Sequence, residues 1–493
     1  MPARVTKEKR RAAPEGLSVR LLQHVTLQAR PGGDIVVGVD DFSASLGKFS
    51  ASVAERVQDL RAGLPLASFA SRRRSLDKEI HLLVRRLAAR GLVEYRLGRS
   101  RGGADQVVIE PQLPDYWPQN PKLRDSEVVV LSRFAYMRRR ADEMVLESPR
   151  AGALFKIRDP KIAALLAALA TPQKVKALRR QAGLAGIELL ALLVDCQILF
   201  KVAANDEGLR PTEGDGNLVL WDFHDLLFHA RSTEGRHANP VGGHYSYADV
   251  VPERPAIRPN WPGTKIDLRP FSTALAQEIS PAAKILNERH STRDFDDLAP
   301  IALAELSRFL DAAARVYSTV ETPLDPDADP AGGGPTLTHT IRPYPSGGAS
   351  YELELYLAVD KCEGLPRGFY HYDAGGHTLV RIEVREPEFE ALLKGAEFAM
   401  GASAVPQILI TIAARFSRVS WKYSSIAYAL ILKDVGVLLQ TLYMMATDIG
   451  LGGCAIGTTN IDLFAKMTGL EFHVEGPVGQ FALGRGVKSE SSC

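Results

Sequence analysis

One stretch of the chain, from Ser420 to Asn460, constrains the fold most, because it holds the longest unbroken apolar pattern in the sequence. Apolar residues recur there at helical spacing, at Ile426, Leu430, Ile431, Val435, Leu438, Leu439 and Leu442. Ser420 is suited to cap the first turn, since its side chain can accept a hydrogen bond from an unpaired amide. The opposite face is nearly as apolar, with Tyr428, Leu432, Val437 and Tyr443. We therefore predict a helix that other elements, or a second subunit, cover on most sides.

Glycines follow this predicted helix. Gly450, Gly452 and Gly453 lack a Cβ, so they can end the helix and let a ligand approach the backbone. A membrane span is the alternative interpretation of the same stretch. Polar residues interrupt the stretch well short of the roughly 20 uncharged residues that a span needs. These are Lys433, Asp434, Gln440 and Asp448. We therefore expect no membrane partner.

The composition is that of a soluble globular protein with more than one domain. A chain of 493 residues is long enough for about two to four buried cores. No apolar segment follows the charged first ten residues, which favours a cytoplasmic location over secretion. The cysteines lack the spacing of a disulfide framework or a zinc site, so no metal is expected. They are Cys196, Cys362, Cys454 and Cys493.

Positive charge is concentrated at the front of the chain. Residues 1–110 carry 20 Lys/Arg and 12 Asp/Glu, a net charge of +8, whereas the whole chain carries only +2. An anionic partner, nucleic acid or acidic peptide, is therefore expected there if anywhere. Arg72, Arg73 and Arg74 would lie on a recognition helix in the nucleic-acid interpretation. Such a run is more often a solvated face, and nothing aromatic is interleaved with it, so we do not expect nucleic acid.

The front half shows one pattern twice. Strand-like and helical segments in residues 19–110 end in two strands, LVEYRL and QVVIEP, which is the order of a winged-helix domain. Residues 127–204 repeat that order, and LAARGLVEYRL matches LLVDCQILFKV in pattern. We predict four segments: winged-helix-like domains over residues 1–120 and 121–210, a Pro-rich connector over 211–280, and a further domain over 281–493.

The last segment is predicted to be α+β. Two amphipathic helices open it, and ELELYLAV, GFYHYD and TLVRIEV then read as strands of an antiparallel sheet. In the first of these, Glu352 and Glu354 alternate with leucines. PQILITIAARF is a short continuous apolar run, as expected of a central strand buried on both faces. Because strands and helices come in separate runs, α+β fits better than a doubly wound fold.

Three separated segments offer groups suited to a phosphate and a flat heteroaromatic ring. Arg289 and Arg293 stand four residues apart with a hydroxyl, Ser291, between them, and can converge on one phosphate. The alternative is a helix C-terminus with compensating positive charge. The second segment is a glycine turn, Pro345–Ala349, and the third pairs Gly452-Gly453 with Gly484-Arg485. No GxGxxG or GxxxxGK[ST] stands at a strand-to-helix turn, so neither a Rossmann site nor a P-loop is supported.

These motifs together carry a family resemblance. ERHSTRDF, RPYPSGGASYELELYLAV with GFYHYD, GLGGCAIG after the long helix and the terminal FALGRG resemble the flavin-dependent nitroreductase superfamily. More narrowly they resemble its SagB-type branch, the azoline oxidases of thiazole/oxazole-modified peptide biosynthesis, including the cyanobactin oxidases. The resemblance covers roughly Pro281 to Gly486. The front half is similar in architecture to the peptide-recognition elements that clamp a leader peptide.

The resemblance implies an α+β fold, a homodimer and FMN bound at the dimer interface. It assigns two sets of residues to the cofactor. Those implied to hold the FMN phosphate are Arg289, Ser291, Arg293 and Arg485. Those implied to line the flavin are Ser346, Gly347, Gly348, Gly452 and Gly453.

A Lys-Tyr pair separates this branch from general nitroreductases, and here it stands as Lys422-Tyr423. Converting a thiazoline or oxazoline to the azole removes a ring proton and a hydride, so the protein must supply a base beside the flavin. A phenol and an ammonium side by side can assist each other in that transfer. The alternative is a packed Tyr beside an exposed Lys.

Three functions remain open at this point. The favoured one is an FMN-dependent dehydrogenase of azoline rings in a ribosomally made peptide, with a cyclodehydratase as a further partner. An NAD(P)H-dependent nitro or quinone reductase is the alternative, although it would need neither the front domains nor Lys422-Tyr423. A flavin-sensing DNA-binding regulator is the third, based on the charge and the winged-helix order of the front half.

Overall fold

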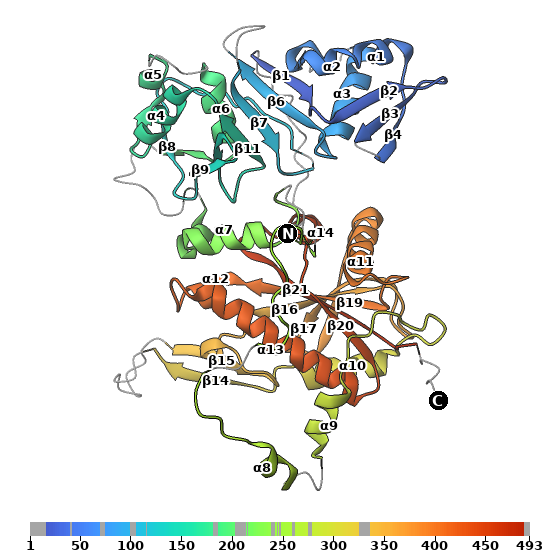
Figure 1. The fold of residues 1–493 in the computed structure, drawn as a ribbon. Coiled ribbons are helices and arrows are strands. Elements are labelled where there is room, and N and C mark those ends of the chain that lie inside the picture. The colour runs from blue at the N-terminus through green and yellow to red at the C-terminus, as the bar shows by residue number, and fades with distance from the viewer. Residues whose placement is uncertain are drawn as a thin grey trace. The chain divides into compact units, whose positions relative to one another are not determined.

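The computed structural model describes most of the chain. It covers residues 16–39, 42–69, 74–98, 105–114, 116–180, 186–202, 213, 215–237, 242–243, 245, 248–258, 262–274, 279–324 and 336–487. The chain divides into two compact units, Met1–Asn239 and Pro240–Cys493, each described here by itself (Figure 1).

The first unit contains a seven-stranded antiparallel sheet. Its order is β5-β1-β6-β7-β11-β10-β9. The strands are β5 (Leu64–Pro65), β1 (Leu17–Leu21), β6 (Val93–Gly98), β7 (Asp105–Pro111), β11 (Ala153–Ile157), β10 (Glu143–Glu147) and β9 (Tyr136–Arg140). A separate sheet holds β2 (Val25–Ala29), β3 (Asp34–Val39) and β4 (Phe42–Lys48), and another holds β12 (Gln173–Lys174), β8 (Val128–Leu131) and β13 (Leu199–Val202).

The helices of this unit pack apolar residues into its core. They are α1 (Ala51–Arg56), α2 (Asp59–Ala62), α3 (Ser75–Ala88), α4 (Pro160–Ala168), α5 (Val175–Leu178), α6 (Ile187–Asp195) and α7 (Phe223–Ser232). In α3 the buried apolar residues are Ile80, Leu83, Val84, Leu87 and Ala88, the spacing of one helical face. Arg74 is the residue before α3, while Arg72 and Arg73 lie outside the described residues.

The two front segments form one structural unit, contrary to the predicted boundary between residues 120 and 121. β7 from the first segment pairs with β11 from the second over five residue pairs, and one buried core runs from Leu17 to Leu199. The predicted pairing of LVEYRL with QVVIEP is confirmed as β6 and β7. Both segments contain a helix followed by a strand, α3 with β6 and α6 with β13. Their winged-helix identity stays a prediction.

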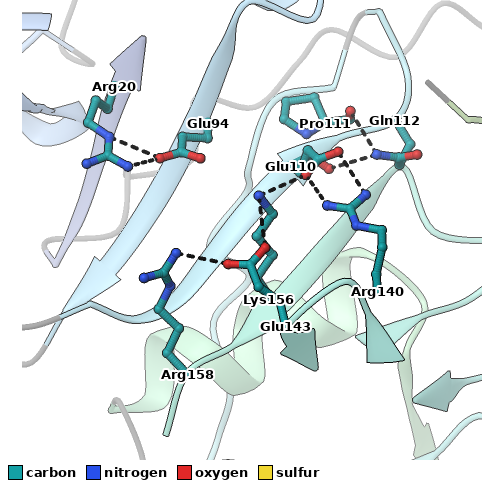
Figure 2. A network of polar contacts seen from close by, with 9 residues as sticks. All are labelled: Arg20, Glu94, Glu110, Pro111, Gln112, Arg140, Glu143, Lys156 and Arg158. Carbon is teal, nitrogen blue, oxygen red and sulfur yellow. Dashed lines mark hydrogen bonds and ion pairs between the residues drawn. The ribbon is translucent and has the colours of Figure 1, made fainter. Parts of the chain in front are cut away.

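A charged network crosses the face of this sheet opposite that core (Figure 2). Glu110 on β7 accepts from Arg140 on β9 at 2.6 Å and lies 3.2 Å from Lys156 on β11. Lys156 also reaches Glu143 on β10 at 3.4 Å, and Arg158 pairs with Glu143 at 3.0 Å. Burial alone would raise the pKa of Glu110, but Arg140 and Lys156 outweigh it and lower that pKa. The network therefore links strands from both front segments.

The predicted connector, residues 211–280, is shorter than expected. Its first part packs into the first unit, because Glu213 accepts from the Ser132 hydroxyl at 2.7 Å and Arg133 donates to the Trp221 carbonyl at 2.9 Å. The unit boundary falls after Asn239. Beyond it lies the short helix α8 (Arg269–Ala274).

The second unit is α+β, as predicted. Its six-stranded antiparallel sheet has the order β18-β17-β16-β19-β21-β20. The strands are β18 (Thr378–Ile382), β17 (Gly368–Asp373), β16 (Leu353–Val359), β19 (Ile408–Arg415), β21 (Glu475–Gly484) and β20 (Gly452–Ile456), and a separate pair holds β14 (Ser318–Pro323) and β15 (Thr336–Ile341). The predicted central strand is confirmed as β19, which is buried except at Arg415 and lies between β16 and β21.

Helices cover both faces of this sheet. They are α9 (Pro281–Glu288), α10 (Leu303–Ala314), α11 (Glu386–Met400), α12 (Phe416–Ser420), α13 (Ala427–Asp448) and α14 (Ile461–Thr468). On one face Phe481 of β21 stacks on Phe309 of α10 and meets Tyr443 of α13 edge to face. On the other face Ala482 belongs to a core that includes Phe389 of α11 and Phe464 of α14.

The long helix begins later than the sequence predicted. Ser420 ends α12 instead of capping the long helix, and α13 begins at Ala427. The backbone at Ser425 adopts a positive φ of 61°, which interrupts the helical path between the two helices. Lys422 and Tyr423 therefore lie in the turn that joins α12 to α13.

α13 is apolar enough to require covering on more than one side. Of the helices among the described residues, α13 passes a test of length and composition for a membrane span. Core helices of soluble proteins pass the same test. Only 33% of its most apolar window is buried. Its exposed positions include Ala429, Lys433, Gly436 and Gln440.

Candidate active site

Tyr443 organises one group of predicted cofactor residues at the C-terminal end of α13. The Arg289 guanidinium lies 5.0 Å from the centre of the Tyr443 ring, and Ser291 Oγ lies 2.8 Å from Tyr443 Oη. Ser291 also forms an isolated parallel bridge with Gly453, where the Thr292 amide donates to the Gly453 carbonyl at 2.8 Å. The structure thus brings together Arg289, Ser291 and Gly453. The sequence had indicated Tyr443 only as part of an apolar face.

The two other predicted phosphate ligands differ in their surroundings. Arg293 is exposed, and its guanidinium makes no hydrogen bond or ion pair with another described residue. Arg485 is engaged, because its guanidinium donates to both oxygens of Glu305 at 2.8 and 2.7 Å. Its backbone amide also donates to Gln407 at 3.1 Å. The structure therefore leaves Arg293, but not Arg485, available for an added anion.

Gly452 and Gly453 are required by the packing of the chain itself. A Cβ on Gly452 would lie 2.6 Å from Thr292, and one on Gly453 would lie 2.2 Å from the Phe481 ring. Both distances are far inside van der Waals contact, so neither position accepts a larger residue without movement. Close packing within the chain therefore explains these two glycines, whereas the sequence analysis had explained them by the approach of a ligand. The contact of Gly452 and Gly453 with flavin stays a prediction.

The second group of predicted residues meets the Lys-Tyr pair at the other end of α13. We call residues Ser346, Gly347 and Gly348 the 346–348 loop. Gly348 has a positive φ of 61°, and a Cβ there would lie 2.2 Å from Tyr423 Oη and 2.8 Å from Lys422 Nζ. Lys422 Nζ donates to the Gly348 carbonyl at 3.1 Å and lies 5.5 Å from the Tyr423 ring centre. Only glycine, therefore, lets the pair approach this loop so closely.

Two carboxyl groups beneath this loop were missed by the sequence analysis. Glu352 was predicted on an alternating strand and Asp434 as a polar interruption, but Glu352 is fully buried and Asp434 is 6% exposed. The Ser346 hydroxyl lies 3.0 Å from Asp434 and 3.3 Å from Glu352, so this predicted flavin contact is engaged within the chain. A charged residue inside an otherwise apolar helix was the available signal.

A cavity of 320 Å³ opens beside Lys422. Its lining contains no carboxylate and combines cationic, hydroxyl and aromatic groups. The lining residues are Thr336, Leu337, Thr338, His339, Gly348, Ala349, Ser350, Arg418, Trp421 and Lys422. Arg418 donates to the Ser350 carbonyl at 2.9 and 3.2 Å, which fixes one wall. The Trp421 ring is 57% exposed and available to stack on a flat ligand.

The two groups lie apart within one chain. Asp434 beneath the 346–348 loop and Tyr443 are nine residues apart on α13, which corresponds to about 14 Å along a helix axis. A ligand that touched both groups of one chain would have to extend along this helix. The alternative is that each group completes a site with a second copy.

Comparisons with known proteins agree with this architecture. Residues 129–238 match the family model of the cyanobactin oxidase ThcOx, and residues 286–485 match the model of the nitroreductase family. The putative nitroreductase MJ1384 of Methanocaldococcus jannaschii is 31% identical over 173 residues, which are 35% of this chain and 76% of that protein. The trifolitoxin-processing protein TfxB of Rhizobium leguminosarum bv. trifolii is 25% identical over 153 residues, 30% of this chain and 41% of that protein.

Solved structures are similar at lower identity. A putative nitroreductase from Ralstonia eutropha gives a TM-score of 0.31 at 21% identity, covering 43% of this chain and 86% of that one. A chain of the Escherichia coli microcin synthetase McbBCD complex gives 0.38 at 19% identity, covering 57% of this chain and 99% of that one.

The family matches define the class of the protein, which is an oxidoreductase. The chain belongs to the nitroreductase family. The cyanobactin oxidase match and the trifolitoxin-processing relative confirm the narrower resemblance to the SagB-type branch.

Proposed function

We propose that the chain is an FMN-dependent dehydrogenase that oxidises thiazoline or oxazoline rings of a ribosomally made peptide to azoles. The observation that carries this proposal is the contact of Lys422 and Tyr423 with the 346–348 loop beside a cavity without carboxylates. The cyanobactin oxidase match over residues 129–238 supports the substrate class.

The residues around Tyr443 fit the phosphate of FMN. Arg289 and Arg293 supply positive charge and Ser291 supplies a hydroxyl, the donor set that a phosphate prefers. Arg485 fits less well, since Glu305 already neutralises it. FMN, when bound, supplies the hydride acceptor.

The Lys-Tyr pair in the turn before α13 is proposed to remove the ring proton. The Gly348 carbonyl holds Lys422 Nζ beside Tyr423. An ammonium at Lys422 would stabilise the phenolate of Tyr423, and that phenolate would accept the proton that leaves the substrate carbon. The exposed Trp421 ring would orient the flat azoline against the wall that Arg418 fixes. In this arrangement Lys422 and Tyr423 are the catalytic residues.

A second copy of the chain is proposed to complete the site. The uncovered face of α13 includes Gly436 and Ala429, whose small side chains permit close helix contact. Pairing two copies there would cover the apolar helix and bring the Tyr443 group of one copy toward the 346–348 loop of the other. Mutating Gly436 to Arg should therefore lower both dimer content and FMN content, measured by light scattering and flavin absorbance.

The first unit is proposed to bind the peptide's leader, with a cyclodehydratase as the enzyme that supplies the azoline. Its edge strand β9 has no strand beyond it among the described residues, so an extended peptide can add there. Fluorescence anisotropy of a labelled leader peptide against residues 1–239 tests this. Sequence-specific DNA binding without leader binding would favour the regulator function instead.

An NAD(P)H-dependent nitroreductase is the second candidate, favoured by the 31% identity to MJ1384. The test is anaerobic single-turnover mixing of the FMN-loaded protein with an azoline peptide and, separately, with NADPH. Bleaching of oxidised flavin by the peptide, with loss of two hydrogens per ring in the mass spectrum, supports the dehydrogenase. Bleaching by NADPH alone supports the reductase.

A further inference from the structure

Glu352 and Asp434 form a pair of carboxyl groups buried beneath the 346–348 loop. The Gly347 amide donates to both oxygens of Asp434, at 2.9 and 3.1 Å. The Ser346 hydroxyl reaches both carboxyl groups. Among the described residues no cation forms an ion pair with either carboxyl group, so like charges would meet there if both were ionised.

Counting hydrogen-bond donors indicates that the pair shares one proton. Ser346 Oγ already accepts from the Tyr351 amide at 3.0 Å, and its single hydroxyl proton can serve only one of the two carboxyl groups. Glu352 Oε1 has no hydrogen-bond partner among the described residues. A buried charged oxygen without a donor is costly, and the neutral acid reduces that cost. Glu352 is therefore the member that keeps the proton, while Asp434 accepts from Gly347 as a carboxylate.

We propose that the protonated Glu352 and the ionised Asp434 form a positioning pair that fixes the 346–348 loop against Lys422 and Tyr423. The proposal rests on the proposed function, since the placement of this loop matters for catalysis only if Lys422 and Tyr423 act on the substrate. The loop transmits the effect because Gly347 is held by Asp434 and its neighbour Gly348 holds Lys422. Neither acid touches the Lys-Tyr pair, so both are positioning residues.

The pair should make the site sensitive to alkali. Burial, followed by the charge of Asp434, raises the pKa of Glu352 to about 7. The charged and titratable groups that face it are Asp434 on α13, Arg418 on α12 and Tyr344 ahead of the loop. Because the pKa is raised in the folded state, the benefit of the protonated form is complete below the ordinary value of 4.5. It is lost as the pH rises through about 7.

The test compares Glu352→Gln with the wild type in FMN-saturated protein. Glutamine copies the size and neutrality of the protonated acid. The rate of single-turnover flavin reduction by an azoline peptide is measured across about pH 6 to 9. We expect the wild-type rate to fall about tenfold per pH unit above about 7, and Glu352→Gln to lack that decline. Glu321→Gln, at an exposed position on β14, should behave as the wild type. Asp434→Ala should lower the rate at every pH.

Two outcomes would overturn the proposal. One is a tenfold or greater loss of rate in Glu352→Gln at about pH 6.5, which would mean that an ionised carboxylate is needed at this position. The other is the same alkaline decline in Glu352→Gln as in the wild type, which would mean that another group titrates.

Thermal unfolding without substrate separates this proposal from the proposed function. The melting temperature of the wild type should fall between about pH 4.5 and 7 relative to that of Glu352→Gln. If that difference appears while the wild type does not oxidise azolines, the carboxyl pair stands and the azoline substrate is wrong. If azolines are oxidised and the difference is absent, the carboxyl pair is wrong.

Discussion

Glu110 in the first unit is partly buried and Glu352 in the second is fully buried, and their pKa values move in opposite directions. Burial raises the pKa of both groups. At Glu110 the charges of Arg140 and Lys156 more than offset burial and lower the pKa. At Glu352 the charged group with the largest effect is another carboxyl group, Asp434, which raises the pKa further. The sign of the shift is therefore decided by the neighbours, and the two sites have different uses.

The contrast extends to the cations. In the charged network of the first unit, each arginine or lysine meets a carboxylate, which stabilises the sheet. In the second unit Lys422 donates only to a backbone carbonyl, and Arg293 has no partner among the described residues. Positive groups without a carboxylate are available to bind and react, which is why we assign chemistry to the second unit.

The largest effect is expected from Lys422 and Tyr423. Lys422→Ala and Tyr423→Phe should each lower azole formation while leaving the flavin spectrum intact, and the double variant should be little worse than the more damaging single one. Positioned acid–base groups contribute about 10²–10⁴-fold, or roughly 3–5 kcal/mol of transition-state stabilisation. Single-turnover flavin reduction measures the effect. Arg140→Ala in the first unit is the control. A near wild-type rate in the double variant would make the pair structural.

The response of the two units to pH should differ in sign. A lowered pKa means that the contribution of Glu110 is present above its ordinary value of 4.5 and is lost as the pH falls. A raised pKa means that the contribution of Glu352 is lost as the pH rises from 4.5 to about 7, at most about 3 kcal/mol. Calorimetry from about pH 2 to 8 should show the first unit losing the Glu110 contribution below pH 4.5 and the second unit losing the Glu352 contribution between about pH 4.5 and 7. Parallel shifts would contradict the comparison.

The sequence predicted the sheet of the second unit well, because its signals are local. The apolar run of β19 and the composition of the glycine loop depend only on neighbouring residues. The start of α13 was predicted wrongly at Ser420, since the positive φ at Ser425 has no clear sequence signal. The shared sheet of the first unit was missed for another reason. Pairing of β7 with β11 joins residues more than 40 apart, and both strands equally suit two separate domains.

The sequence indicated which residues belong to the candidate site, but not which contacts they make. Arg289 and Ser291 meet at Tyr443, which the sequence did not indicate, and their role toward FMN stays a prediction. Arg485 is paired with Glu305, and the Ser346 hydroxyl contacts two buried acids. Such hydrogen bonds and ion pairs depend on which residues, distant in the sequence, the fold brings into contact. Periodicity contains no information on that, which is why Glu352 was expected on an alternating strand face.

The proposed phosphate site offers a smaller test, which compares an arginine without a carboxylate partner with one that has a partner. Arg293→Ala should weaken FMN binding by roughly 1.5–3 kcal/mol, the contribution of a hydrogen bond to a charged group. Arg485→Ala should have less effect, because that guanidinium must first leave Glu305. Glu305→Gln is the matched variant and should strengthen binding if Arg485 takes part after all. Fluorescence titration with FMN gives the affinities, and equal losses in the two arginine variants would remove the distinction.

The smallest expected effect concerns the charged network itself. Glu110→Gln removes the carboxylate that holds Arg140 and Lys156, and the site is partly exposed, so water screens much of the loss. We expect the first unit to lose about 1 kcal/mol of unfolding free energy at neutral pH, with azole formation unchanged. Asp142→Asn, in the turn beside Glu143, is the control for removing a surface charge.

Because Glu110 contributes only while ionised, the difference between Glu110→Gln and the wild type should disappear as the pH falls below 4.5. Urea unfolding of the two variants at neutral and acidic pH measures this. A difference that persists in acid would mean that Glu110 acts through its shape, and that the network is not held by charge.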